Sequence, residues 1–113
     1  MIWVLKIDME LSKGILFVRL DGYLNRNTSY KINNYLVPVI LKHKIKYLVF
    51  NLYKLNDIDE TGIDALLNTK YAIKNNKGNL YLCEINPQLT KKISKLHIKK
   101  ILNETEAKRI IEV

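Results

Sequence analysis

The sequence predicts an α/β fold in which helices pack against a mostly parallel or mixed β-sheet. Apolar runs of strand type alternate with segments of helical periodicity along most of the chain. Only the turn signal Lys13-Gly14 separates the first two apolar runs, so the chain is expected to open with a hairpin. A length of 113 residues with 48% hydrophobic residues fits one domain with one core, spanning residues 1–113.

The first half of the chain predicts a hairpin followed by a helix. The first strand is expected at residues 2–7, on an edge of the sheet, and the second at Ile15–Leu20, ended by Gly22. A helix is expected to begin near Asn25, because polar side chains there can accept hydrogen bonds from free backbone N–H groups. Pro38 lacks an N–H and predicts a kink or break in this helix. Its inward positions are expected to be Ile32, Tyr35, Leu36 and Val39.

The middle of the chain predicts a buried strand and a long helix. Tyr47–Leu52 is almost uninterrupted in its apolar character, which favours a central strand covered on both faces. A short polar loop is expected next, and then a helix from about Glu60 to Asn75. Gly78 is expected to end that helix with a positive φ. The inward residues of the helix are predicted to be Ile63, Leu66, Leu67 and Tyr71.

The last third predicts two more strands and two short helices. The strands are expected at Leu80–Ile85 and Ile98–Leu102. Asn86-Pro87 provides a capping residue and a first-turn proline for the helix between them. Asn103 is expected to cap the final helix. The buried residues of the first of these helices are predicted to be Leu89, Ile93 and Leu96. The whole order predicts a mixed sheet of about five strands with about four helices packed against it.

The composition argues against several functional classes. A net charge of +8 permits contact with anionic partners, but arginine occurs only three times and is not interleaved with aromatic residues. We therefore expect no specific nucleic-acid binding. The lysines between residues 91 and 100 form either a basic docking face or the solvated side of a short helix. No apolar run approaches the roughly 18 residues that span a bilayer, so no membrane insertion is expected.

No catalytic or metal site assembles from the sequence. His43 and His97 are far apart and flanked by lysines, as is typical of exposed residues. Cys83 lies within a predicted strand and is expected to act as a small buried hydrophobe. No cofactor, metal or enzymatic activity is therefore predicted. The single cysteine and the absence of a basic leader favour the cytoplasm.

Four carboxylates crowd the start of the long helix: Asp57, Asp59, Glu60 and Asp64. Their spacing does not match a calcium loop. A helix N-terminus stabilises negative charge by about 0.3–1 kcal/mol per exposed group. The cluster is therefore interpreted as structural, with Asp59 as the cap and Glu60 in the first turn.

Three segments resemble the STAS-domain anti-sigma-factor antagonists of bacteria. Asn51-Leu52, a short spacer and Asp59-Glu60-Thr61-Gly62 are similar to the family signature Asn-Leu, spacer, Asp-Ser-Ser/Thr-Gly. The segment from Val18 to Asn25 resembles the family's Leu-x-Gly-x-Leu/Ile-Asp strand, with Asn25 replacing the acid. Residues 78–87 resemble its glycine-led strand that ends before a proline. The resemblance extends from about Gly14 to Ile111.

This resemblance implies a protein-interaction module that binds an anti-sigma factor of the serine-kinase type. The contact surface is then expected to contain Asn25, Asp59, Glu60, Thr61 and Gly62, with Gly62 allowing the partner to approach closely. Glu60 stands where the family carries the phosphorylated serine. Glu60 therefore either imitates the phosphorylated, non-binding state or faces a partner adapted to a fixed charge. Alternatively, Thr61 is the phospho-acceptor.

Other functions are also compatible with the sequence. A STAS module can serve in a lipid-transport complex or a stress scaffold, and a nucleotide-binding module is a weaker alternative. The chain is expected to be a monomer or a weak homodimer, because the first strand leaves an exposed edge.

Overall fold

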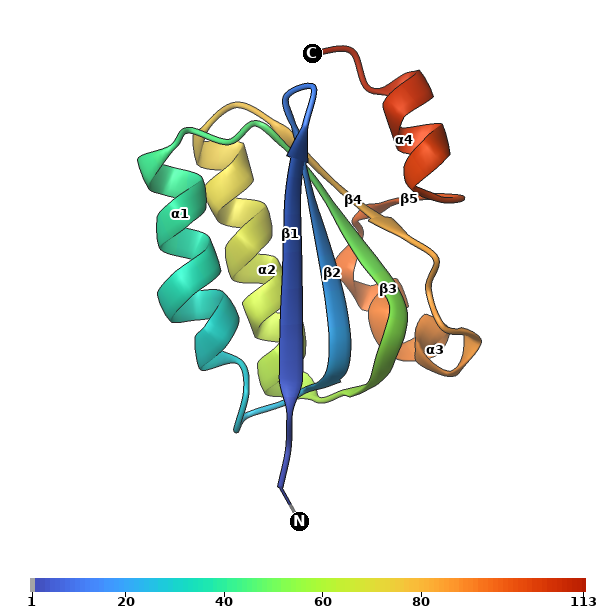
Figure 1. Cartoon of the computed structure of the whole chain (residues 1–113). Coiled ribbons are helices and arrows are strands. Elements are labelled where there is room, and N and C mark those ends of the chain that lie inside the picture. The colour runs from blue at the N-terminus through green and yellow to red at the C-terminus, as the bar shows by residue number, and fades with distance from the viewer. Residues whose placement is uncertain (1) are drawn as a thin grey trace.

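The computed structural model describes residues 2–113 and confirms the mixed α/β fold (Figure 1). One five-stranded sheet has the order β1-β2-β3-β4-β5. Strand β1 is antiparallel to β2, and all other neighbours are parallel. In chain order the elements are β1 (Leu5–Ser12), β2 (Ile15–Leu24), η1 (Lys31–Leu36), α1 (Val37–Lys42), β3 (Tyr47–Ile58), α2 (Glu60–Asn75), β4 (Asn79–Cys83), η2 (Pro87–Leu89), α3 (Thr90–Ile93), η3 (Ser94–Leu96), β5 (Lys99–Ile101) and α4 (Glu104–Ile110).

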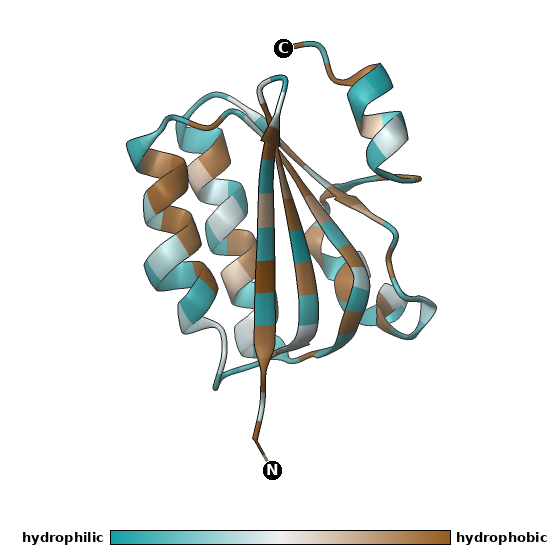
Figure 2. Cartoon of the chain, viewed as in Figure 1, coloured by the Kyte–Doolittle hydropathy of each residue, from teal (hydrophilic) through white to brown (hydrophobic). Residues whose placement is uncertain are grey.

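Helices cover both faces of this sheet. Helices α1 and α2 lie on one face and α4 lies on the other (Figure 1). Side chains alternate between the faces along each strand, as the banding of β1 in Figure 2 shows. The larger hydrophobic cluster lies on the α1/α2 face and includes Leu89, Ile93 and Leu96, which confirms the burial predicted for the α3 segment. The smaller cluster lies under α4.

The predicted hairpin turn is confirmed, but the first strand is displaced. Lys13 and Gly14 both have positive φ (52° and 82°) and join Ser12 to Ile15. Strand β1 begins at Leu5 and ends at Ser12, so the prediction of residues 2–7 was wrong in its limits. Pairing with β2 sets these limits, because every residue of β1 faces a residue of β2.

Gly22 does not end β2 as predicted, since the strand continues to Leu24. Its φ of +120° accompanies a shift in the register between β2 and β3. A Cβ atom on Gly22 would lie only 2.1 Å from the carbonyl oxygen of Val4. Gly22 is therefore a bulge residue that lets the N-terminal segment pass closely. From the sequence alone, such a glycine was interpreted as the end of the strand.

The first helix starts with a π-helical turn, Lys31–Leu36, and continues as the α-helix Val37–Lys42. Pro38 lies at the start of the α-helical part, directly after the π-helical turn, and having no N–H it cannot donate a hydrogen bond to that turn. The predicted kink or break thus takes the form of a change in helix type. Ile32 and Leu36 are buried as predicted, but Tyr35 is 63% exposed, so its predicted inward position was wrong.

Strand β3 is the central strand, as predicted, but it continues through the expected polar loop to Ile58. Lys54 and Asp57 pair with residues of β2 after a shift in register. Leu55 and Ile58 are buried and anchor this extension. A polar sequence therefore forms strand here because a neighbouring strand offers backbone partners and the apolar side chains alternate.

Helix α2 has the predicted limits, Glu60–Asn75. Tyr71, expected to point inward, is 62% exposed. The positive φ at the helix end belongs to Lys77 (63°) and not to Gly78. Gly78 is required for another reason, because a Cβ atom there would overlap the carbonyl oxygen of Lys46.

Both predicted caps in the last third of the chain are confirmed. The Oδ1 atom of Asn86 accepts a hydrogen bond from Gln88 N (3.1 Å), and that of Asn103 accepts one from Glu106 N (2.8 Å). Strands β4 and β5 are shorter than predicted. Within residues 2–113, no helix has the length and apolar character needed to cross a membrane.

Candidate functional site

The residues singled out in the sequence meet at one end of the sheet. Strands β2 and β3 end there, the loop after β2 crosses the end, and α2 begins (Figure 1). The backbone N–H of Asp59 donates to the carbonyl oxygen of Leu24 (3.2 Å). This bond joins the last residue of β2 to the residue that precedes α2.

Asp59 caps α2 as predicted and also holds the neighbouring loop. Its Oδ1 atom accepts a hydrogen bond from Gly62 N (2.8 Å), and its Oδ2 atom accepts one from Arg26 N (3.1 Å). Charge-assisted bonds of this kind are stronger than neutral ones. One carboxylate therefore fixes the two segments of the site relative to each other.

Asn25 orders its own loop and does not cap a helix. Its Oδ1 atom accepts from Asn27 N (2.9 Å), and its N–H donates to Thr28 Oγ1 (3.0 Å). Its carbonyl oxygen accepts from the Ser29 hydroxyl (2.6 Å). An asparagine followed by these partners makes a local turn, which competes with helix formation. Helical structure accordingly begins later, at Lys31.

Glu60 and Thr61 present the exposed part of the site. Both are exposed and occupy the first turn of α2. The positive end of the helix dipole favours negative charge at this place, by about 0.3–1 kcal/mol for an exposed group. The start of α2 therefore favours the carboxylate of Glu60, and Thr61 places a hydroxyl group in the same turn.

Gly62 is buried, unlike its neighbours Glu60 and Thr61. A Cβ atom on Gly62 would lie 2.3 Å from the carbonyl oxygen of Leu24 and 2.7 Å from Ile58 Cγ1. The structure thus gives Gly62 a packing role that the sequence did not predict, and its part in the approach of a partner stays a prediction. The glycine lets α2 approach the end of β2.

The acidic cluster is dispersed in the structure. Asp57 forms an ion pair with Lys92 Nζ (2.6 Å), whose hydrogen bond holds the pKa of Asp57 below its usual range. Asp64 lies exposed on the second turn of α2. Among residues 2–113, no group of carboxylate, histidine or cysteine side chains could hold a metal ion. Lys92 belongs to the basic segment 91–100, so that segment is partly used for internal contacts.

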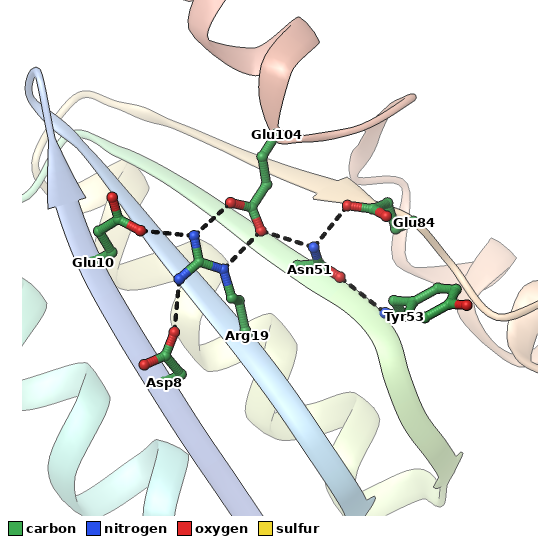
Figure 3. A network of polar contacts seen from close by, with 7 residues as sticks. All are labelled: Asp8, Glu10, Arg19, Asn51, Tyr53, Glu84 and Glu104. Carbon is green, nitrogen blue, oxygen red and sulfur yellow. Dashed lines mark hydrogen bonds and ion pairs between the residues drawn. The ribbon is translucent and has the colours of Figure 1, made fainter.

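A second polar cluster, which the sequence reasoning missed, lies on the opposite face of the sheet from α2 (Figure 3). Arg19 contacts Asp8 through Nη1 (2.6 Å) and Glu10 through Nη2 (2.8 Å). It also forms a bidentate pair with Glu104, from Nε (2.9 Å) and Nη2 (2.6 Å). Asn51 donates to the same carboxylate (2.7 Å).

This cluster fastens the start of α4 to the sheet. The hydrogen bond from Arg19 is the largest cause that lowers the pKa of Glu104, and the same bond raises the pKa of Arg19. Asn51 also donates to Glu84 (2.8 Å), and a cavity of about 480 Å³ lies beside these residues. One sequence signal could have revealed this cluster. Arg19 and Asn51 are polar residues that each interrupt an otherwise apolar strand.

The remaining candidate residues behave as predicted. Cys83 is fully buried, and burial raises the pKa of its thiol to about 12. It is a small core residue rather than a nucleophile. His43 and His97 are exposed.

Comparison with known proteins gives consistent results. The STAS domain family model matches residues 6–109. The anti-sigma F factor antagonist of Paenibacillus polymyxa is 28% identical over 113 residues, covering 96% of this chain and 97% of that protein.

Solved structures show the same fold. The anti-sigma factor antagonist SpoIIAA in its unphosphorylated form has a TM-score of 0.75 and 19% identity, covering 96% of this chain and all of that one (100%). A serine-to-glutamate variant of RsbS from Moorella thermoacetica has a TM-score of 0.76 and 15% identity, with 92% of each chain covered.

Proposed function

We propose that this chain, which belongs to the STAS-domain family, binds an anti-sigma factor through the surface around the start of α2. The antagonist from Paenibacillus polymyxa, similar over nearly the full length of both proteins, supports this assignment. We infer a binding module rather than an enzyme, and we propose a partner of the serine-kinase type. No cofactor is part of the proposal.

One observation carries the choice of surface. Glu60 and Thr61 are exposed side by side at the start of α2, while Asp59 and Gly62 on either side are engaged in holding that start in place. A frame held by internal contacts thus presents two exposed side chains at a helix N-terminus. Such a frame suits recognition of charge by a partner, because the positions of the charges are fixed before binding.

Glu60 is proposed to replace the phospho-acceptor of the family. A carboxylate offers no hydroxyl group to a kinase, so residue 60 is a permanent charge. A phosphoserine carries about −1.5 to −2 charge, and Glu60 supplies part of that on a longer side chain. Thr61 offers a hydroxyl group one residue later in the same exposed turn. It is the alternative acceptor.

The central experiment uses the cognate anti-sigma factor with ATP and the variant Glu60→Ser. Mass spectrometry is expected to find no phosphate on residue 60 of the wild type and a new phosphate on the serine of the variant. Calorimetry is expected to show a change in affinity of about 2 kcal/mol or more, because a charge central to the contact is removed. Asp64→Asn removes a neighbouring charge outside the first turn of α2 and serves as the matched control.

The direction of the change identifies the role of Glu60. Tighter binding by Glu60→Ser means that Glu60 imitates the phosphorylated state. Weaker binding means that the partner has adapted to the charge. A phosphate on wild-type Thr61 keeps the function and moves the acceptor by one residue. Equal affinity of Glu60→Ser, Asp64→Asn and wild type, with no new phosphate, would refute this surface.

A further inference from the structure

Strand β1 forms a free edge of the sheet, one strand beyond β2. It has eight residues, Leu5–Ser12, and pairs on one side only, with β2 (Figure 1). Free strand edges present unpaired N–H and C=O groups to other chains. The question is what chemistry this edge offers to a partner strand.

The hairpin register fixes which backbone groups point outward. Ser12 and Ile15 flank a two-residue turn and form a hydrogen-bonded pair, so the even-numbered residues of β1 bond to β2. The odd-numbered residues Ile7, Met9 and Leu11 therefore direct their N–H and C=O groups to the free edge. A contact agrees with this parity: the carbonyl oxygen of Leu5 accepts a hydrogen bond from Lys31 Nζ (2.6 Å), a residue outside the sheet.

The same odd-numbered residues carry apolar side chains that are only partly covered. Met9 is 48% exposed and Leu11 is 63% exposed. A groove of about 530 Å³ lies between this row and the first helix, where Tyr30 and Tyr35 are 46% and 63% exposed. Exposed apolar groups beside an open strand edge are typical of surfaces that bind another strand.

The charges of β1 are complementary to those of a second copy of the same strand. In an antiparallel pair, outward-pointing residues must face one another, which allows only a few registers. A pair centred on Met9 places Asp8 opposite Glu10, and one centred on Asp8 places two aspartates opposite each other. Like charges in these positions destabilise a pair. A pair centred on Ile7 instead places Lys6 opposite Asp8 twice.

We propose that two copies of this chain associate through antiparallel pairing of their β1 strands, centred on Ile7. Lys6 of each copy then faces Asp8 of the other, and Leu5 faces Met9 on the apolar side. Leu5 is fully buried and Lys31 Nζ bonds to its carbonyl oxygen, so Leu5 pairs with Met9 only once the Lys31 side chain moves aside. The two groups of exposed tyrosines lie on either side of the joined strands.

Sedimentation equilibrium of the wild type, from micromolar concentration to about 1 mM, tests the proposal. A reversible monomer–dimer equilibrium is expected. Lys6→Glu is expected to weaken it about tenfold or more, because two attractive pairs become repulsive. Lys91→Glu makes the same change in net charge on the exposed surface of α3 and is expected to leave the equilibrium unchanged.

A charge exchange makes the test specific. Lys6→Glu and Asp8→Lys are each expected to be monomeric alone, and to form a one-to-one heterodimer when mixed, since both cross-strand pairs are then attractive. Met9→Pro removes an outward N–H without touching the bonds to β2, so its circular dichroism is expected to stay native while dimers are lost. A monomeric wild type at about 1 mM, or dimers that persist in Lys6→Glu and Met9→Pro, would overturn the proposal.

Discussion

The two faces of the sheet are built from the same strands but are covered differently. On the α1/α2 face, β2 and β3 present an unbroken apolar surface under helices that run along the sheet. On the other face, the short helix α4 (7 residues) covers only one end. There the strands change from apolar residues, Phe17 and Val49, to the polar residues Arg19 and Asn51.

This difference shows how the length of a covering helix sets the polarity of the sheet beneath it. The change from apolar to polar occurs where α4 begins, at Glu104, which accepts from both Arg19 and Asn51. Beyond that point water reaches the strands, and a cavity follows. One face therefore stabilises the domain through hydrophobic burial, and the other fastens its last helix through a polar cluster.

The largest effect is expected from Phe50→Ala, in the apolar cluster of the α1/α2 face. Phe50 is fully buried, and deleting its ring is expected to lower the free energy of unfolding by about 3–5 kcal/mol. Urea denaturation followed by circular dichroism measures this loss. Phe17→Ala, under α4, is the comparison: it is expected to increase the thiol reactivity of Cys83 more than Phe50→Ala does. Equal thiol reactivity in the two variants would argue that the faces are not separate units.

Gly62→Ala is expected to lower the free energy of unfolding by about 1–3 kcal/mol. The added Cβ atom meets the carbonyl oxygen of Leu24, which is backbone and cannot turn away. Thermal denaturation measures the loss. The neighbouring substitution Thr61→Ala, at an exposed position, is expected to change stability little. If Gly62→Ala is as stable as the wild type, the approach of α2 to β2 is looser than described.

Glu104→Gln is expected to lower stability by about 1 kcal/mol at neutral pH and to leave it nearly unchanged in acid. The folded-state pKa of Glu104 is depressed, chiefly by Arg19. Its contribution is therefore present above the ordinary pKa of about 4.3 and is lost as the pH falls through the depressed value. The raised pKa of Arg19 keeps that group charged throughout this window.

Urea denaturation of Glu104→Gln and of the wild type measures the loss of stability at about pH 7 and about pH 3. These two pH values lie on either side of the ordinary glutamate pKa. Asp57→Asn is the control for Glu104→Gln. Asp57 is the other carboxylate with a depressed pKa, but it lies away from α4. The thiol of Cys83 is expected to become more reactive in Glu104→Gln, since α4 covers it. A loss of stability that is the same at both pH values would contradict the ion-pair role of Glu104.

The smallest effect is expected from Lys92→Ala. Its ion pair with Asp57 is exposed on both sides (52% and 57%), and such pairs contribute about 0.2–1 kcal/mol. The loss should shrink further as salt is added. A loss that is large and insensitive to salt would show that Lys92 acts by packing and not by charge.

Local sequence signals predicted most elements of this fold. The turn at Lys13-Gly14, the caps Asp59, Asn86 and Asn103, and the limits of α2 each depend on residues close in sequence. The errors made at the glycines have another cause. Gly22, Gly62 and Gly78 are needed because the backbone of a distant segment lies against them. The residues near each glycine do not predict which distant segment will pack against it.

The sequence by itself determined the class of fold, the helix start that carries Glu60 and Thr61, and the burial of Cys83, because periodicity, capping and hydrophobicity act over a few residues. Only the tertiary structure decided that β3 continues to Ile58, that Gly62 is a packing residue, and that Arg19 meets Glu104 across 85 positions of sequence. These features depend on which strands become neighbours and where a helix returns to the sheet. Both are set by long-range burial of apolar surface, which fixes partners that the local sequence does not specify.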